Sequence, residues 1–488
     1  MKRNFLVALL FVLAAVRLPP PVAASATGVR AAPRIDPALA ARLRPPAAEQ
    51  PIRIIVHLAS PADHAGPHTA PAAEIETRLR RRAATSQAPM LEWLHAYEAE
   101  GRVTDVTSFW VFDGLALAAT PDVIRALAKR PEVERITLDH VIVAPHRSRA
   151  ASAPSEDDLR PVEANLELIG APEAWARGVT GQGVLVGLLD TGVDVTHPDL
   201  AARWRGGANS WFDPSGEHPD APIDVDGHGT QVLGVILGGD AGGSRIGVAP
   251  DAQWIAAKIF DDRGRATVSG IPRALQWVLD PDGDPATADA PRVLNNSWSS
   301  AGAPCDLEFS EDLRALRAAG ILPVFAAGVN APVSPADLSE ALAVGALAED
   351  GETLHFDSAH GPSSCSGEAA VYPQVVAPGA NIRTTDRSGL YTTLDGTSLA
   401  AAHVSGALAL LLSADPSLSA DEQASILTET AIDLGERGPD SEFGYGRIDI
   451  GAALERVRPR PQPSPLVLTG VLALLLIGVA MLARARRA

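Results

Sequence analysis

The sequence predicts an α/β fold, in which a parallel sheet flanked by helices follows a small ferredoxin-like α+β domain and precedes a transmembrane helix. Between about residues 161 and 455, continuous apolar runs such as VLVGLLD and QWIAAKIF alternate with helix-length segments, as in sheets buried on both faces. Residues 52–143 instead follow the order β-α-β-β-α-β of a ferredoxin-like domain. The run 465–483 carries no charge and is long enough to cross a bilayer.

The first residues have the pattern of an export signal. Lys2 and Arg3 precede an apolar run that ends at Val16, and small residues then lead to an expected cleavage point after Ala26. The apolar run is too short to span a bilayer comfortably. We therefore interpret 1–26 as a cleaved signal peptide rather than an anchor.

The segment 27–144 is expected to contain the small domain. An alternating strand opens it, a charged helix-patterned segment follows, and the pair Thr120–Pro121 marks the start of a second helix. The run 133–143 is expected as its last strand. A polar stretch without periodicity, 145–160, comes next and is interpreted as an exposed linker.

The large domain, 161–455, is followed by segments that predict a membrane tether. These are a Pro-rich linker at 456–464, the apolar run at 465–483 and a basic tail at 484–488. At ~1.5 Å per residue the apolar run makes a helix of about 28 Å, against a hydrocarbon core of ~30 Å. Positive charge marks the cytoplasmic side, so we expect an exported, single-pass protein whose main body lies outside the cell membrane.

The overall charge excludes one class of partner. The 488 residues carry a formal net charge of −18 at pH 7, and no basic stripe is visible along the chain. Nucleic-acid binding needs such a stripe to meet the phosphates. We therefore expect no nucleic-acid partner.

The chain contains two cysteines, Cys305 and Cys365. In an exported chain an even pair predicts a disulfide rather than two free thiols. Metal binding by two cysteines this far apart is the weaker alternative.

Three reactive side chains stand at predicted strand ends and helix starts. Asp190 ends a buried apolar strand, His228 lies between two glycines before a helix-patterned segment, and Ser398 follows Gly-Thr at the start of a helix. Each alone has a structural explanation, as a cap or a packed residue. Together they supply what acyl transfer requires: a serine, an imidazole that takes its proton, and a carboxylate that orients the imidazole. His403 lies about 140° round the helix from Ser398 and is interpreted as a packed residue.

These residues lie in motifs that resemble those of the subtilisin-like serine proteases. The motifs DTGVD, GHGT and GTSLAAAHVSG occur in the order Asp, His, Ser. The stretches NSWFDP, WIAAKIF, LNNSW and VVAPGANIR are most similar to the bacillopeptidase F branch, and the resemblance covers about 162–455. It implies that Asp190, His228 and Ser398 form a catalytic triad acting on proteins or peptides. It also implies that 52–143 is an inhibitory propeptide domain, which we expect a monomeric enzyme to remove by self-cleavage within 145–160.

The resemblance also identifies a segment expected to line the substrate cleft. It comprises Ser297, Trp298, Ser299 and Ser300. The family more often has two glycines where the last two serines stand, so we expect a narrower pocket for the residue before the scissile bond.

A second departure from the family concerns the oxyanion. In the family, Ala-Ala-Gly at a strand end is followed directly by an asparagine whose side chain donates to the oxyanion. Here Val329 follows Gly328, and Asn330 comes one place late. The favoured interpretation is that one donor is missing. The alternative is that the turn absorbs an extra residue and Asn330 restores the donor.

Other classes of site and protein compete with this interpretation. The loop 280–284, DPDGD, alternates aspartates like a calcium loop, but no full ligand set follows, so we interpret it as an acidic turn and expect no cofactor, with calcium as the alternative. Sedolisin-like proteases have a Glu-Asp pair in place of the histidine, and zinc hydrolases a His-Glu-x-x-His motif that is missing here. A membrane-tethered binding module built on an inactive protease fold stays open.

Overall fold

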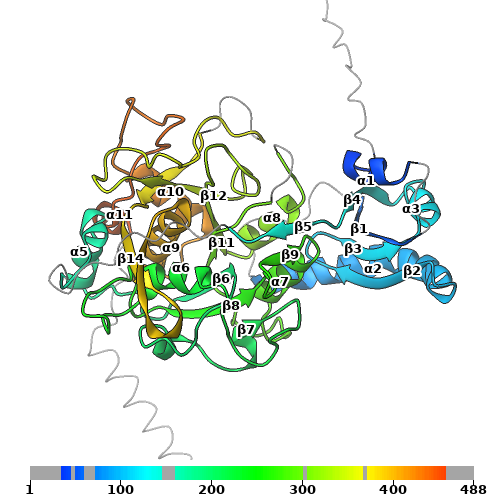
Figure 1. The fold of residues 1–488 in the computed structure, drawn as a ribbon, viewed down its shortest axis with the longest axis horizontal. Helices are drawn as coiled ribbons and strands as arrows, with labels where there is room; N and C mark the ends of the chain where they lie inside the picture. Colours follow the sequence, from blue (N-terminus) through cyan, green and yellow to red (C-terminus); the bar gives the residue numbers. More distant parts are fainter. Residues whose placement is uncertain are drawn as a thin grey trace, which may run out of the picture.

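The computed structural model describes residues 34–44, 50–59, 72–145, 160–300, 305–365 and 371–457. The expected signal peptide, nearly all of the expected linker, most of the Pro-rich segment and the apolar run at 465–483 lie outside these ranges. The described residues form a small N-terminal domain beside a larger one (Figure 1).

The small domain is a four-stranded antiparallel sheet, in the order β2-β3-β1-β4, covered by helices. Its element order is β-α-β-β-α-β from β1 to β4, as the sequence predicts. Its elements are α1 (Pro37–Arg42), β1 (Ile52–Leu58), α2 (Ala72–Ala99), β2 (Val103–Phe109), β3 (Gly114–Ala119), α3 (Pro121–Leu127) and β4 (Val133–Leu138).

The expected last strand of this domain is in fact two strands. The run 133–143 is divided between β4 and β5 (Val141–Val143), and β5 leaves the small sheet to pair with β9 (Arg265–Thr267) of the large domain. The break occurs at Asp139, whose carboxylate accepts hydrogen bonds from the backbone N–H and hydroxyl of Ser269, at 2.9 and 2.8 Å. Contacts with another domain, which the local pattern does not encode, therefore end the strand.

The large domain is built on a seven-stranded sheet in which every pairing is parallel. The strand order is β13-β12-β11-β10-β6-β8-β7, and the continuous apolar runs of the sequence form five of these strands, all except β7 and β13. The strands are β6 (Leu185–Asp190), β7 (Trp211–Phe212), β8 (Gln253–Lys258), β10 (Val293–Asn296), β11 (Leu322–Ala326), β12 (Leu342–Leu347) and β13 (Val375–Pro378), with a separate hairpin of β14 (Ile382–Thr385) and β15 (Tyr391–Leu394).

Helices cover both faces of this sheet, so it is buried on both sides. Alternate strand residues point to opposite faces: Leu188 joins the core formed with α6 and α9, and Leu189 joins the core formed with α7 and α8. The helices are α4 (Ala164–Leu168), α5 (Ala171–Ala176), α6 (His228–Leu237), α7 (Gly270–Leu279), α8 (Ser310–Ala318), α9 (Thr397–Ala414), α10 (Ala420–Glu429) and α11 (Ile450–Arg456).

Helix α9 lies at the centre of the large domain. Among the described residues it is the one helix long and apolar enough to cross a membrane, yet 83% of its apolar window is buried inside the protein. Its apolar character is therefore explained by core packing.

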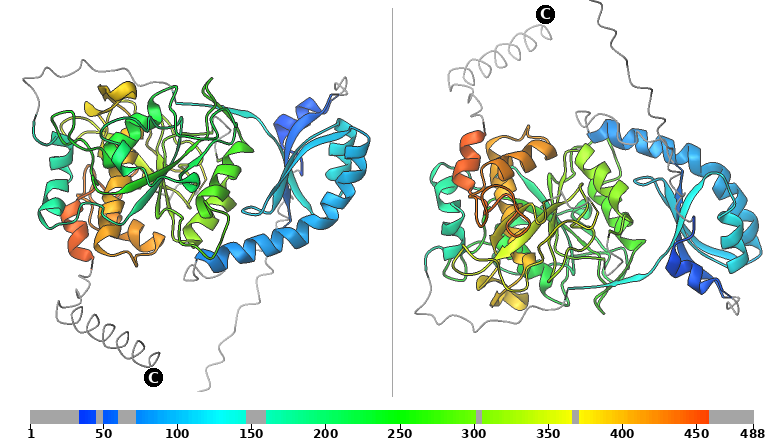
Figure 2. Two further views of the ribbon diagram at one scale, coloured as in Figure 1. Left: turned by 90° about the horizontal axis from the view of Figure 1, so that it is seen from below. Right: turned by 90° about the horizontal axis from the view of Figure 1, so that it is seen from above.

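The two domains share an interface. Figure 2 shows the small domain at one end of the large one, with the first turns of α2 reaching the large domain. The backbone N–H groups of Trp110 and Val111 donate to Gln276 Oε1 of α7 at 2.6 and 3.3 Å. Apolar side chains of both domains join in one hydrophobic core, including Ile55, Ile75, Leu79 and Phe109 from the small domain and Ile271, Leu275, Leu313 and Leu316 from the large one.

Candidate active site

Asp190 and His228 meet where β6 ends and α6 begins. His228 Nδ1 lies 2.7 Å from Asp190 Oδ1, and both side chains are buried. The close approach depends on Gly229, because a Cβ atom there would lie 2.1 Å from the carbonyl oxygen of Gly192 in the loop after β6. The glycine after the histidine thus lets α6 start directly against the end of the strand.

Ser398 completes a hydrogen-bonded chain with these two residues. It is the second residue of α9, and its Oγ lies 3.0 Å from His228 Nε2. Gly396 caps this helix with a φ of 143°, a conformation that side-chain-bearing residues rarely adopt. The structure therefore brings together the three residues that the sequence places 208 positions apart, from Asp190 to Ser398.

Burial and charge act in opposite directions on His228. Burial disfavours a charged ring, but the negative charge of Asp190 and its hydrogen bond outweigh burial and raise the pKa of His228. This environment stabilises an imidazolium, the form that His228 takes when it accepts a proton from a serine.

His403 has a different environment, as the helix geometry predicts. It is fully buried, its Nδ1 lies 2.8 Å from the Leu399 carbonyl oxygen, and its Nε2 lies 2.7 Å from Asn165 Nδ2. Burial lowers its pKa to about 4, so it is neutral at physiological pH. It packs within α9 and takes no part in the chain at Ser398.

Asp224 is a buried residue of the site that the sequence reasoning missed. Its Oδ1 accepts hydrogen bonds from the Thr191 hydroxyl and the Gly227 N–H, at 3.0 and 2.7 Å. Its Oδ2 accepts from the N–H and hydroxyl of Thr230, at 2.9 and 2.7 Å. One carboxylate thus ties the loop after β6 to the first turn of α6, on which His228 lies. The sequence signal that could have identified Asp224 is its position four residues before His228, just ahead of a helix start.

We expect Asp224→Ala to lower kcat by about tenfold or more with little change in KM, because small displacements of catalytic groups have large effects on rate. Steady-state kinetics on a peptide substrate measures this. Asp220→Asn, an exposed carboxylate of the same loop, is the matched control and should leave both constants unchanged. Equal kcat values for Asp224→Ala and the control would contradict the positioning role.

Val329 occupies the place after Gly328 at the end of β11, and its side chain is 59% exposed. It forms an isolated β-bridge with Ser358, and the next residue, Asn330, donates its backbone N–H to the Asp357 carbonyl oxygen at 2.9 Å. Asn330 adopts a φ of 63° and is also exposed. These backbone bonds fix the turn, while the absence of an oxyanion donor from Asn330 stays a prediction.

The expected cleft segment is largely buried. Trp298 is 3% exposed and packs edge-on against Phe309 and Phe325, so its side chain belongs to the core rather than to a cleft surface. The Ser297 hydroxyl donates to the Ser398 carbonyl oxygen at 3.2 Å. The Ser300 side chain is also buried and donates to Ser334 O at 3.0 Å, whereas Ser299 keeps intermediate exposure.

Cys305 and Cys365 are joined by a disulfide, as the sequence predicts. The bond links positions 60 residues apart in the chain.

We expect this disulfide to stabilise the folded protein by about 4 kcal/mol in the chain-entropy model, because it closes a long loop. Non-reducing peptide mapping of exported protein should recover the two cysteines in one linked peptide. Two free thiols in folded, exported protein would contradict the pairing.

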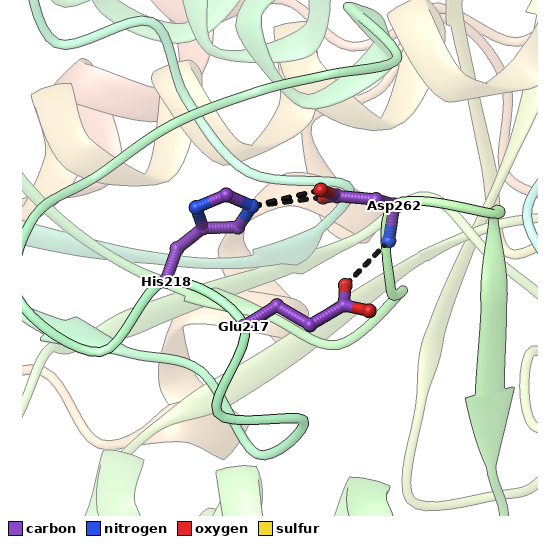
Figure 3. A group of neighbouring side chains, drawn as sticks. All are labelled: Glu217, His218 and Asp262. Atoms are coloured by element: carbon purple, nitrogen blue, oxygen red, sulfur yellow. Dashed lines mark hydrogen bonds and ion pairs between the residues drawn. The ribbon is translucent and has the colours of Figure 1, made fainter.

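Two groups of described side chains have donor atoms close enough to hold a metal ion. The first comprises Glu217, His218 and Asp262 (Figure 3). His218 Nε2 lies 2.9 and 3.0 Å from the Asp262 carboxylate oxygens, and Glu217 accepts from the Asp262 N–H at 2.8 Å. The buried ammonium of Lys258 also lies 3.3 Å from Asp262. These partners explain the group as a link between two loops, and we assign no metal to it.

The second group, Asp280, Asp282 and Asp289, includes two of the three aspartates of the expected acidic turn. Arg80 of the small domain lies 2.7 Å from Asp280 Oδ2, and Arg205 donates to the Asp289 carbonyl oxygen at 2.6 Å. Calcium takes about six to eight oxygen ligands, whereas here two guanidinium groups already accompany three carboxylates. This arrangement does not fit a calcium ion.

Comparisons with known proteins agree with the geometry. Residues 181–446 match the model of the Subtilase family. The chain is 34% identical over 423 residues to Bacillopeptidase F of Bacillus subtilis (strain 168), a match that covers 78% of this chain and 28% of that protein. It is 34% identical over 266 residues to the Major intracellular serine protease of the same strain, covering 52% of this chain and 76% of that protein. It is also 34% identical over 297 residues to Subtilisin DY of Bacillus licheniformis, covering 59% and 97% respectively. The chain thus spans little more than a quarter of the first of these relatives and nearly all of the third.

Proposed function

The chain belongs to the subtilase family, and we propose that it is a serine-type endopeptidase with Asp190, His228 and Ser398 as its catalytic triad. The observation that carries this proposal is the buried hydrogen-bonded chain from Asp190 through His228 to Ser398. Its substrates are proteins or peptides.

Each member of the triad has a separate role in the proposed reaction. Ser398 Oγ attacks the carbonyl carbon of the scissile peptide, and His228 Nε2 takes its proton. Asp190 accepts the Nδ1–H of His228 and stabilises the imidazolium. The proton then passes to the leaving amine, and a water activated by His228 hydrolyses the acyl-enzyme. The N-terminus of α9 contributes a positive potential at Ser398.

We further propose that residues 27–144 form an inhibitory propeptide that the enzyme removes by cleavage within 145–160. Three contacts support this: the strand pairing of β5 with β9, the hydrogen bonds of two backbone N–H groups to Gln276, and the shared hydrophobic core. The chain is proposed to be exported through the segment 1–26 and tethered by 465–483, on the sequence features given above.

A second candidate function is that of a weakly active or inactive binding module on the same fold. The observation that favours it is Val329, because an apolar side chain at the family's asparagine position cannot donate to an oxyanion.

Covalent labelling distinguishes the two candidates. A serine-directed inhibitor is expected to modify Ser398 in the processed chain, as located by peptide mass mapping, and a broad peptide library should be cleaved. A processed chain that is neither labelled nor able to cleave the library would support the binding module instead.

A further inference from the structure

The interface between the two domains contains a pair of carboxyl groups, one from each domain. Glu76 of α2 and Asp280, directly after α7, are both buried and contact the same guanidinium group. Arg80 bridges them, with Nε 2.5 Å from Glu76 Oε1 and Nη2 2.7 Å from Asp280 Oδ2. The remaining oxygen of Asp280, Oδ1, is buried and has no hydrogen-bond partner among the described residues.

One guanidinium cannot neutralise two carboxylates, so a proton on Glu76 resolves this arrangement. The pKa of Glu76 is raised from its ordinary value of 4.5 to about 7. Burial is the main cause, and the neighbouring carboxyl group of Asp280 is the second. The other charged groups near the pair are Asp282, Asp289 and Arg205. When protonated, Glu76 can donate to Asp280. When ionised, it faces that carboxylate across the interface.

A second buried acid, Asp312, lies on α8 of the large domain. Asp312 is fully buried, and neither of its carboxylate oxygens has a hydrogen-bond partner among the described residues. Burial, followed by the charges of Glu308 and Glu311, raises its pKa well above the ordinary value, whereas Arg135 of β4 acts in the opposite direction. Asp312 therefore also favours a proton in this arrangement of the two domains.

Glu308 stays ionised and provides the fixed charge at this point of the interface. His57 Nε2 lies 2.8 Å from its Oε1, and Arg135 Nη1 lies 2.9 Å from its Oε2, both from the small domain. Burial opposes the charge, but these two partners lower the pKa of Glu308 to about 2.

We propose that protons hold the small domain on the large one, so that it is retained in acid and released as the pH rises through neutrality. The proposal rests on the proposed role of the small domain as a propeptide, and it assigns the proton sites to Glu76, opposite Asp280, and to Asp312. The separated domains would expose Glu76 to water, where it ionises near its ordinary value of 4.5.

Proton linkage determines whether association strengthens or weakens as the pH rises. A carboxyl group whose pKa is raised in the complex binds more protons in the complex than when free, so association is strongest below the ordinary pKa and weakens up to the raised one. For Glu76 this window runs from about pH 4.5 to about 7. One pKa unit corresponds to about a tenfold change in the association constant, so Glu76 alone predicts a loss of between about tenfold and a hundredfold between pH 5 and 8.

The test uses the full-length chain with Ser398→Ala and an inserted site for a site-specific protease within 145–160. The chain is immobilised by its C-terminal end and cut at the inserted site. The apparent dissociation constant of the small domain is then measured from the fraction retained at pH 5, 6, 7 and 8. We expect it to rise at least tenfold from pH 5 to 8.

Neutral isosteres locate the protons. Glu76→Gln should reduce the change of the dissociation constant with pH by the contribution of one carboxyl group. Glu76→Gln combined with Asp312→Asn should nearly abolish this change and keep the small domain bound at pH 8. Glu74→Gln, an exposed neighbour on the same helix, should behave like the parent chain. Asp312→Asn alone provides a second reading if a Glu76 variant folds poorly.

The possible outcomes distinguish a failure of the proposed proton sites from a failure of the proposed propeptide role. A small domain that stays bound with a constant or rising affinity from pH 5 to 8, or a Glu76→Gln profile equal to that of Glu74→Gln, would overturn the proton sites alone. Release at every pH would contradict the propeptide role as well.

Discussion

Full-length protein carrying Ser398→Ala is expected to accumulate with its N-terminal domain still attached and to lose peptide hydrolysis by on the order of 10⁴-fold or more. The alanine removes the hydroxyl oxygen that lies 3.0 Å from His228 Nε2, and with it the proposed nucleophile. Processing is read from the mass of the exported chain in a protease-deficient host, and hydrolysis from a peptide substrate.

A serine at the far end of the same helix provides the matched control. Ser413→Ala removes a hydroxyl that is buried without a hydrogen-bond partner among the described residues, so this variant should mature and hydrolyse peptides normally. Normal maturation of Ser398→Ala in the protease-deficient host would show that another protease removes the domain.

Val329→Asn is expected to raise kcat by about 10² to 10³, because it restores a side-chain donor at the place where the family has one. This range equals the decrease in kcat that loss of the corresponding donor causes in subtilisin, a member of the family. Steady-state kinetics on a peptide substrate measures the gain, and KM should change little, since the donor acts on charge that develops in the transition state.

Asn330→Ala is the companion variant. The backbone of Asn330 is held by Asp357, and the bond uses no side-chain atom, so removal of the side chain should leave kcat nearly unchanged. A large loss of rate in Asn330→Ala would instead identify Asn330 as the oxyanion donor.

Sequence reasoning could bring Asp190, His228 and Ser398 together because local patterns determine much of their relative placement. A buried apolar strand that ends in Asp190, and helix starts marked by glycines before His228 and Ser398, gather at one edge of a parallel sheet. The same reasoning could assign five of the seven strands of that sheet, β6, β8, β10, β11 and β12, from their continuous apolar runs.

The interface could not be predicted in this way, because it depends on which surfaces meet. Asp312 lies in the first turn of α8, where an acidic residue usually lies in solvent and complements the helix dipole. In α2, Glu76 follows the buried Ile75 and has the sequence context of an ordinary helix residue. Both carboxyl groups are buried in the folded chain, and the division of 133–143 into two strands results from the pairing of β5 with β9 of the large domain.

Helix α9 couples the position of Ser398 to the packing of the hydrophobic core, two properties that are separate in many enzymes. Its first turn carries Ser398, and the next four turns are buried among the strands of the sheet and α6. A cavity made far along this helix, for example at Leu408, would let the helix shift, and displacements of about 1 Å are enough to slow catalysis about a hundredfold. The catalytic rate therefore depends on how well the interior around α9 is packed. A core substitution that loosens this packing should lower kcat before it unfolds the protein.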